Sequence, residues 1–443
     1  MRFRPVFLAP WLGILALGCG EDSADVSAAA VTEPINVAYI CVGAAGEAGH
    51  SCDDGDPCTT NDQCAKGECV GGERLGLLYG GKFLEEALAI AALPDGGVAM
   101  AGYTTSQGAG KEDAWLVRTD AKGNHLWDFT YGGPTDDRAL ALARVIDGYV
   151  LAGYTNAGVA KVGADLWLVR TDLTGKFLWQ KTYGGPGVDY ANAMNVLDNG
   201  HIRIAGYAQT LGKQSGDADV VEVDADGKLL WDKTFGAEGD DFANAMIVLS
   251  DGGFLVAGAT TVANHAQDGW FVRADAAGTS LWTQTFGGGS NDAFQAVVPV
   301  GDGFAATGYT QSAGNGSSDL WLVRTDASGK KLWEKTFGSP LLDTGNAIAL
   351  LSNGNFAIGG DTKGKVVGKS TETQSWLLYV DPVGVFVNEW TYGVVGKGEN
   401  FINAITVLPD GGVALAGTTD AHGTSLYDMW LVRTDAAGKS TCQ

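Results

Sequence analysis

The 443-residue chain is poor in basic residues, with 29 Lys and Arg against 52 Asp and Glu and a formal net charge of −23. A surface this acidic repels the phosphates of nucleic acids and of anionic lipid headgroups. We therefore expect no nucleic-acid partner and no electrostatic attachment to an anionic bilayer. The excess of negative charge instead favours the solubility of an exposed protein.

Motifs for catalysis and metal binding are also missing. The sequence contains no nucleophile elbow, no zincin helix and no phosphate-binding loop. Its five histidines lack the spacing of metal ligands: they are His50, His125, His201, His265 and His422. No catalytic residue is therefore predicted from a motif.

Helical periodicity is absent from residues 75–443, where the sequence instead repeats seven times. Each repeat carries an aromatic residue followed by glycine, and successive copies are 51 to 55 residues apart. These markers are Tyr79, Tyr131, Tyr183, Phe235, Phe286, Phe337 and Tyr392. A period of about 52 residues is typical of β-propeller blades, so the chain is predicted to be all-β.

Each repeat is expected to form four short strands. In the third repeat the first strand begins at Asp189, and Asp198-Asn199-Gly200 supplies a tight hairpin turn. The third strand carries the strongest pattern, Asp-x-Trp-Leu-Val-Arg-Thr-Asp, as in residues 165–172, 319–326 and 428–435. Glycine-containing turns bound these strands, as β-hairpins require.

The ends of the repeat region indicate how the ring closes. The seventh repeat stops after Lys439, before its fourth strand, while an unmatched fourth-strand segment, residues 74–79, precedes the first repeat. We predict a seven-bladed β-propeller of four-stranded blades, spanning residues 73–443, in which this N-terminal strand completes blade seven. Sharing a blade between the chain ends would also cover an open sheet edge.

Recurring side chains indicate the core between blades. One position of the first strand is always alanine, which suits the crowded axis: Ala89, Ala141, Ala193, Ala245, Ala296, Ala347 and Ala404. Tryptophan recurs in the third strand at 115, 167, 270, 321, 376 and 430 and in the fourth at 127, 179, 231, 282 and 333. We interpret these rings as packing between blades rather than as a carbohydrate platform.

The turn and fourth strand of the repeats carry a resemblance to a known family. Residues 172–179 and 326–333, with their Asp, Gly and Trp, resemble the tryptophan-docking repeat of pyrroloquinoline-quinone-type propellers. The Asp-to-Gly gap is one residue shorter than in that family, whose propellers usually have eight blades, so no quinone cofactor is expected. The resemblance points to non-enzymatic bacterial members, such as the lipoprotein propeller of the outer-membrane barrel-assembly machinery.

The N-terminus predicts export and a lipid anchor. Arg2 and Arg4 precede an apolar run, residues 6–17, that is too short to span a bilayer and fits a signal peptide over residues 1–18. Ala16-Leu17-Gly18-Cys19 resembles a bacterial lipobox, which makes Cys19 the lipidated residue. Gly20 gives no inner-membrane retention signal. We expect anchoring at the outer membrane or cell surface, through a flexible tether over residues 19–40.

A cysteine-rich module follows at residues 41–72. Its dense cysteines in an exported chain predict disulfides, because so short a segment cannot build a sufficient core. We expect three disulfides, one reaching the C-terminal cysteine, with the pairing otherwise open. The cysteines are Cys41, Cys52, Cys58, Cys64, Cys69 and Cys442. Residues 52–64 resemble short cysteine-rich motifs of surface proteins from predatory soil bacteria.

Repeated acidic residues form the main candidate site. An acidic ring at the channel mouth is predicted where the first strands begin, with Asn400 as the counterpart in blade seven: Glu85, Asp137, Asp189, Asp241, Asp292 and Asp343. An outer ring is predicted where the third strands begin: Asp113, Asp165, Asp217, Asp268, Asp319 and Asp428. Such carboxylates could bind calcium or a cationic ligand. Because every blade repeats them, we favour acceptors of backbone hydrogen bonds. Calcium at Asp53, Asp54, Asp56 and Asp62 of the cysteine-rich module is a further alternative, although acidic residues are also ordinary turn formers.

Two blades depart from the repeat. Blade three has Arg203, Asp219 and Glu222 where other blades favour an apolar residue, tryptophan and arginine. Blade six has Tyr379 and Asn388 at conserved arginine and tryptophan positions, and a longer loop, residues 362–374, containing Lys363, Lys365 and Lys369. These residues could contact a partner, although drift in a degenerate repeat is the interpretation we favour.

Together these patterns favour a non-enzymatic, monomeric envelope lipoprotein that binds a protein or glycan partner. No cofactor is expected beyond possible calcium. Two alternatives stay open: an enzyme (a hydrolase, a lyase or a quinoprotein) acting at the channel mouth, and a purely structural envelope protein.

Overall fold

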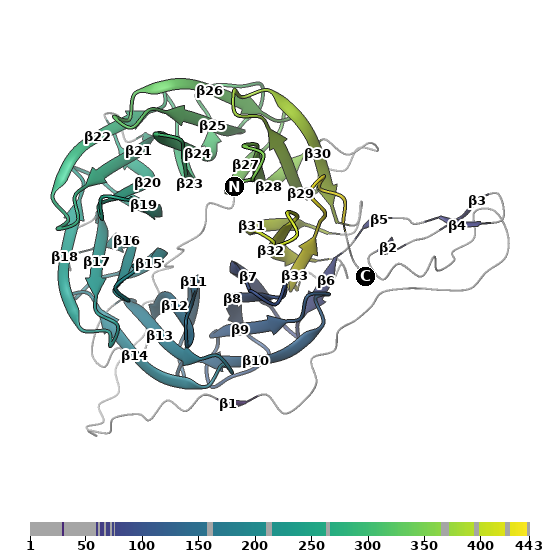
Figure 1. The fold of residues 1–443 in the computed structure, drawn as a ribbon, viewed down its shortest axis with the longest axis horizontal. Coiled ribbons are helices and arrows are strands. Elements are labelled where there is room, and N and C mark those ends of the chain that lie inside the picture. The colour runs from purple at the N-terminus through teal and green to yellow at the C-terminus, as the bar shows by residue number, and fades with distance from the viewer. Residues whose placement is uncertain are drawn as a thin grey trace, which may run out of the picture.

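Seven four-stranded antiparallel sheets form a ring, which confirms the predicted seven-bladed β-propeller (Figure 1). The computed structural model describes residues 29–30, 59–60, 63–65, 68–70, 73–74, 76–156, 163–209, 215–262, 266–364, 372–393, 398–420 and 426–440. In blades one to six the four strands follow one another in sequence order from the ring axis to the rim, whereas blade seven takes its outermost strand from the N-terminal side of the propeller.

The strand bounds repeat closely from blade to blade. Blade one contains β7 (Glu85–Ala92), β8 (Val98–Thr104), β9 (Asp113–Thr119) and β10 (His125–Tyr131). Blade two contains β11 (Asp137–Val145), β12 (Gly148–Thr155), β13 (Asp165–Asp172) and β14 (Phe177–Tyr183). Blade three contains β15 (Asp189–Val196), β16 (Ile202–Ala208), β17 (Asp217–Val223) and β18 (Leu229–Phe235). Blade four contains β19 (Asp241–Val248), β20 (Phe254–Thr261), β21 (Gln267–Ala274) and β22 (Ser280–Phe286).

The remaining blades follow the same plan. Blade five contains β23 (Asp292–Val300), β24 (Gly303–Thr310), β25 (Asp319–Thr325) and β26 (Lys331–Phe337). Blade six contains β27 (Asp343–Leu350), β28 (Phe356–Lys363), β29 (Thr373–Val380) and β30 (Phe386–Tyr392). Blade seven contains β31 (Asn400–Val407), β32 (Val413–Thr419) and β33 (Asp428–Arg433), and its outer strand is β6 (Leu77–Tyr79).

Blade seven is closed by the N-terminal strand, as predicted. Leu77, Leu78 and Tyr79 of β6 pair antiparallel with Leu431, Trp430 and Met429 of β33. Further hydrogen bonds join blades seven and one: Glu85 N–H donates to Tyr427 O over 2.7 Å, and Asn403 Nδ2 donates to Ala87 O over 2.8 Å. The two ends of the propeller therefore stabilise each other.

Every innermost strand contains a bulge at the same place, and the bulge links neighbouring blades. In blade three the register between β15 and β16 shifts at Asn192, whose Nδ2 donates to Ala243 O of blade four. Asn244 and Asn346 make the equivalent bond to the next blade. A bulge re-aims the extra residue out of the ladder, so its amide can reach the adjacent sheet.

Aromatic side chains pack between blades, as the repeats predicted. The strand-three tryptophans are buried, and those of strand four lie over the glycine of the next blade's turn, so that a methyl group on Gly175 would collide with Trp127. The marker tyrosine adds a hydrogen bond there, because Tyr183 OH donates to Gly227 O over 2.6 Å. In blade six Trp390, two residues past Asn388, covers the equivalent Gly438 and donates to Ala437 O.

The third-to-fourth-strand turns are stabilised by an aspartate, as expected. Asp172 Oδ1 accepts hydrogen bonds from the backbone N–H groups of Thr174 and Lys176. The same bonds recur at Asp120, Asp224, Asp275, Asp326, Asp381 and Asp435. These aspartates fix turns and account for part of the negative charge.

Short strands precede the propeller. β1 (Ala29–Ala30) pairs with β10, β2 (Thr59–Thr60) with β5 (Glu73–Arg74), and β3 (Gln63–Ala65) with β4 (Glu68–Val70). Cys64 and Cys69 are register partners in the last pair. Cys19, Cys41, Cys52, Cys58 and Cys442 lie outside the described residues, as do the predicted signal peptide and most of the predicted tether.

Candidate functional site

The predicted acidic ring begins the innermost strands, but its side chains are buried at the boundaries between blades. Glu85, Asp137, Asp189, Asp241, Asp292 and Asp343 are 0 to 3% exposed. One oxygen accepts a backbone N–H from the residue four positions earlier, as in Gly133 N to Asp137 Oδ2 at 2.8 Å. In blades one, four and six a threonine near the end of the second strand donates to the other oxygen, as Thr104 does to Glu85 Oε1 at 2.9 Å. The ring therefore anchors strand starts.

At five of the blade boundaries the ring residue lies beside an aspartate of the predicted outer ring. A methyl group on Gly132, which has φ of 145°, would stand 2.6 Å from Asp137 Oδ2 and 2.9 Å from Asp113 Oδ1. Asp217 and Asp241 flank Gly236 in the same way, and Asp428 and Glu85 flank Gly80. A side chain at the marker glycine would thus collide with two carboxyl groups that come from consecutive blades.

Burial and mutual repulsion raise the pKa of Asp137 and Asp428, one carboxyl group from each ring. Burial, with the charges of Asp113 and Asp136, raises the pKa of Asp137 to about 6 despite its hydrogen bonds. Burial, with the charges of Glu85 and Asp420, raises the pKa of Asp428 to about 7. Between blades six and seven the pair is neutral, Gln374 and Asn400, which avoids this repulsion.

We expect Asp428→Asn to stabilise the protein at pH 7.5 and to change little at pH 4.5. In the folded state Asp428 keeps its proton up to about pH 7, whereas in the unfolded state an aspartate loses its proton near pH 4. The contribution of Asp428 to the unfolding free energy is therefore lost as the pH rises from about 4 to about 7. Removing the charge should add about 1–2 kcal/mol at pH 7.5, allowing for partial solvent screening. Urea unfolding at both pH values measures it; equal destabilisation at both would contradict it.

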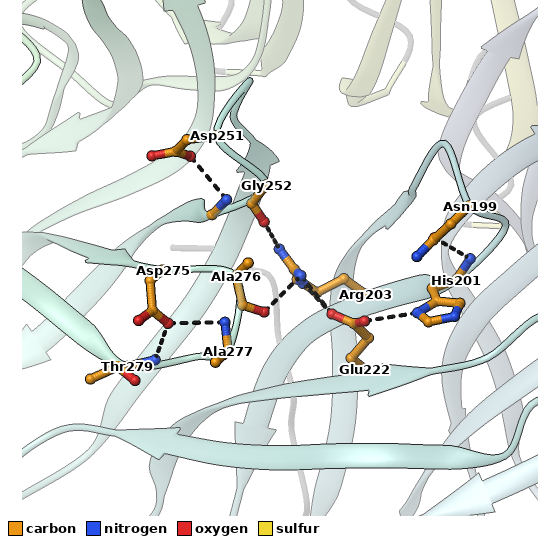
Figure 2. A network of polar contacts seen from close by, with 11 residues as sticks. Asn199, His201, Arg203, Glu222, Asp251, Gly252, Asp275, Ala276, Ala277 and Thr279 are labelled. Carbon is orange, nitrogen blue, oxygen red and sulfur yellow. Dashed lines mark hydrogen bonds and ion pairs between the residues drawn. The ribbon is translucent and has the colours of Figure 1, made fainter.

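Blade three contains a buried ion-pair network where the repeat is irregular (Figure 2). Arg203 Nε donates to Glu222 Oε2 at 3.0 Å, and its Nη1 donates to Gly252 O of blade four at 3.0 Å. His201 Nδ1 lies 3.0 Å from Glu222 Oε1. Elsewhere an arginine at the Glu222 position pairs with a turn aspartate, as Arg273 does with Asp251. Arg203 is only 2% exposed, so its hydrogen bonds join blades three and four in the interior.

Asp219 occupies the strand-three tryptophan position of blade three. In other blades the indole N–H donates to the residue 13 positions later, as Trp115 Nε1 does to Asp128 at 2.9 Å. Here the corresponding residue is Asp232. Burial and the hydrogen-bonded Asp232 raise the pKa of Asp219 well above its usual range. A carboxyl–carboxylate bond thus replaces the indole–carboxylate bond at this place.

The departure that opens a cleft lies in blade six. The residue that follows each ring residue in strand one pairs with a residue of strand two. In four blades this strand-two partner is a tyrosine: Tyr103, Tyr154, Tyr207 and Tyr309. These side chains stack across blade boundaries, as in Tyr207 on Phe242 with ring centroids 5.1 Å apart and Arg138 3.9 Å above the Tyr103 ring. In blade six the pair is Thr344 and Asp361, which leaves this layer incomplete.

The gap in the layer is a cleft of about 160 Å³, the blade-six cleft. It is lined by Tyr309, Gln311 and Ser318 of blade five, by Leu342, Thr344, Asp361, Lys363 and Thr373 of blade six, and by Glu399 and Phe401 of blade seven. Tyr309 and Phe401, the nearest aromatic members of the layer, are present while the residues between them are small or polar. The hollow therefore lies where Thr344 and Asp361 replace the larger side chains of the layer.

Protein donors hold the two carboxylates of the cleft in place. Asp361 accepts hydrogen bonds from Asn346 Nδ2 at 2.7 Å and from Ile402 N at 3.0 Å. Glu399 accepts from Thr373 Oγ1 at 3.2 Å, and its Oε1 lies 3.5 Å from Lys363 Nζ. Lys363 and Glu399 remain 28% and 36% exposed, so they face the opening.

Sequence reasoning found part of this site. It singled out the loop containing Lys363, whereas Lys365 and Lys369 lie outside the described residues. It missed Asp361 and Thr344. An alignment of the seven repeats would have shown that blade six has Asp361 where four other blades have tyrosine. Tyr379 and Asn388 lie in strands β29 and β30 and do not line the cleft.

The described residues contain neither a cluster of metal ligands nor a membrane-spanning helix. Among the part of the chain that the structure describes, no three His, Cys, Asp or Glu side chains gather as a metal site requires. Asp53, Asp54, Asp56 and Asp62 lie outside that part. No helix in the described ranges is long and apolar enough to cross a membrane.

Comparisons with known proteins show the fold alone. No protein-family model matches the chain, and no curated protein matches its sequence. The WD40 propeller domain of Doa1 is 14% identical, with a TM-score of 0.50 over 81% of this chain and 96% of that one. A candidate 6-phosphogluconolactonase from Bacteroides fragilis is 10% identical, with a TM-score of 0.43 over 84% and 97%. An extracellular domain of a two-component system from B. thetaiotaomicron is 11% identical, with a TM-score of 0.48 over 81% and 40%.

Proposed function

We propose that this protein is a non-catalytic binding scaffold of the cell envelope, and that the blade-six cleft is its binding site. The cleft carries the proposal because it is an asymmetric hollow on an otherwise repetitive framework. The aromatic layer is complete in most blades and interrupted in blade six, so polar groups that could contact a ligand are exposed at one defined place. The partner is a protein or a glycan, and one propeller acts alone.

The arrangement of the carboxylates favours binding over catalysis. Asp361 and Glu399 both accept hydrogen bonds from fixed protein donors, which suits acceptors that orient a ligand. A general acid would need a carboxyl group kept protonated, and the raised pKa values of Asp137 and Asp428 belong to buried pairs between blades. Blade-boundary carboxyl groups at 0 to 3% exposure also leave no room for substrate beside them.

The proposed location rests on the N-terminal sequence. Residues 1–18 have the features of a lipoprotein signal peptide, Cys19 is the proposed lipidated residue, and residues 20–40 would tether the propeller. Disulfides among the six remaining cysteines suit an exported protein. The repeats resemble those of tryptophan-docking lipoprotein scaffolds, which is consistent with a binding role in the envelope.

Asp361→Tyr tests the binding site, because it restores the tyrosine that four other blades have at this position. We expect the variant to fold and to fill the cleft, with a slightly lower melting temperature because the hydrogen bonds that Asp361 accepts from Asn346 and Ile402 are lost. A photoreactive residue at the exposed Ala313, two positions after the cleft-lining Gln311, should give cross-linked adducts in cells producing the full chain. These adducts should disappear with Asp361→Tyr and persist with Ala277→Tyr, which adds the same ring to an exposed turn on the opposite face. Adducts unaffected by Asp361→Tyr would contradict the proposal.

Cys19→Ser should release the protein from membranes. Without the thiol no lipid can be attached, and the propeller itself is too acidic to bind an anionic bilayer. Fractionation and palmitate labelling measure the result. Wild-type protein that takes up no label and is found in the soluble fraction would rule out the anchor.

A further inference from the structure

We infer that the blade-six cleft binds a neutral, hydroxylated sugar ring at one residue of a glycan, an inference that rests on the binding function proposed for this cleft. The first support is the mixture of charges around it. Two carboxylates, Asp361 and Glu399, face one ammonium group, Lys363. An anionic ligand would meet a net negative site in a protein whose overall charge is −23.

A cationic ligand is also poorly matched. Lys363 lies at the opening of the cleft with its Nζ 3.5 Å from Glu399 Oε1, so a second cation would compete for that carboxylate and approach a like charge. A lysine or arginine side chain of a protein partner would therefore bind against Lys363. A neutral ligand avoids both repulsions.

Hydrogen-bonding capacity points the same way. Lys363 can only donate, the carboxylates of Asp361 and Glu399 can only accept, and the hydroxyl of Ser318 and the amide of Gln311 can do both. A sugar hydroxyl donates one hydrogen bond and accepts others, so vicinal hydroxyls can satisfy this mixed set. A ligand without such hydroxyls would displace water from these polar groups and would not replace its hydrogen bonds, which costs affinity.

The walls of the cleft suit the apolar side of a sugar ring. Tyr309 of blade five and Phe401 of blade seven belong to the aromatic layer that is interrupted between them, and both line the hollow. Phe401 is held by Tyr427, with ring centroids 6.2 Å apart, and Tyr309 packs with Ala293 of its own blade. Rigid rings supply contact area at little entropic cost. A volume of about 160 Å³ confines the bound part to a single ring.

Binding of defined sugars to the full chain tests the inference. The probes are methyl β-D-glucopyranoside, methyl α-D-mannopyranoside and N-acetylglucosamine, with glucuronic acid and lysine methyl ester as charged comparators, measured by saturation-transfer NMR. We expect at least one neutral sugar to bind, glucuronic acid to bind at least about tenfold more weakly, and lysine methyl ester not to compete. Asp361→Tyr should abolish binding, Glu399→Gln should weaken it about tenfold, and Ala277→Tyr should leave it unchanged.

Three results would overturn the inference: no binding of any neutral sugar, sugar binding that survives Asp361→Tyr, or preferential binding of lysine methyl ester. The proposed function fails separately. If the Ala313 adducts still depend on Asp361 while no neutral sugar binds, the cleft is a binding site for another class of ligand. If the adducts are also independent of Asp361, the cleft is not the binding site at all.

Discussion

Deleting residues 74–79 should reduce the unfolding free energy by about 5–9 kcal/mol, because three buried side chains are lost at about 1.5–3 kcal/mol each. Leu77, Leu78 and Tyr79 are buried against blade seven, and β6 is its outer strand. This loss is of the same order as the whole stability of a typical domain. Blade seven would keep three strands, and the exposed edge of β33 would promote aggregation.

A deletion of the same length in the tether, residues 22–27, provides the control, since it shortens the chain without removing β6. Thermal unfolding by circular dichroism and light scattering measures both variants. The closure deletion should melt at a much lower temperature and aggregate, and the control should behave as wild type. A closure variant with the wild-type melting temperature would refute the shared blade.

Arg203→Met should cost about 3–5 kcal/mol, because it leaves the carboxylate of Glu222 buried without its main partner. Arg203 also donates to Gly252 O and Ala276 O of blade four, so its loss uncouples two blades (Figure 2). The double variant Arg203→Met/Glu222→Met should recover most of the loss, since replacing a whole buried pair by apolar side chains is often neutral.

Arg273→Met is the matched control for this network. Arg273 is the blade-four arginine at the position of Glu222, but its partner Asp251 is 61% exposed and can be hydrated when left alone. Its loss should therefore cost less than that of Arg203 in urea unfolding. Equal costs for the two arginines, or a double variant as unstable as Arg203→Met, would show that the pair is not energetically coupled.

The fold could be predicted because the local signals recur in most or all of the seven repeats. The marker aromatics, the turn aspartates and the strand-three pattern all have the same role in successive blades, and the missing fourth strand at Lys439 identified residues 74–79 as its replacement. The favoured interpretation of the acidic ring also agrees with the hydrogen bonds of Asp137 and its equivalents. Repetition turns weak local patterns into a strong prediction.

The site was harder to predict, because it depends on contacts between blades. Asp361 and Thr344 look like ordinary strand residues until Tyr309 and Phe401, from different blades, are placed on either side. Likewise, Arg203, Asp219 and Glu222 were recognised as irregular, but their burial and their bonds to blade four follow from three-dimensional packing. Departures from a repeat are visible in sequence, whereas their consequence is set by the neighbours they meet.

Hydrogen–deuterium exchange tests most directly whether the blade-six cleft is the binding site. The full chain is measured alone and together with the cell-envelope fraction that co-purifies with it. The binding site proposed here predicts slower exchange in peptides covering residues 309–318, 342–345, 361–363 and 399–402, with no change in the third-to-fourth-strand turns. Asp361→Tyr should remove this protection. Protection confined to the outer strands or to the turn face, or protection that is unchanged in Asp361→Tyr, would contradict the assignment of the blade-six cleft as the binding site.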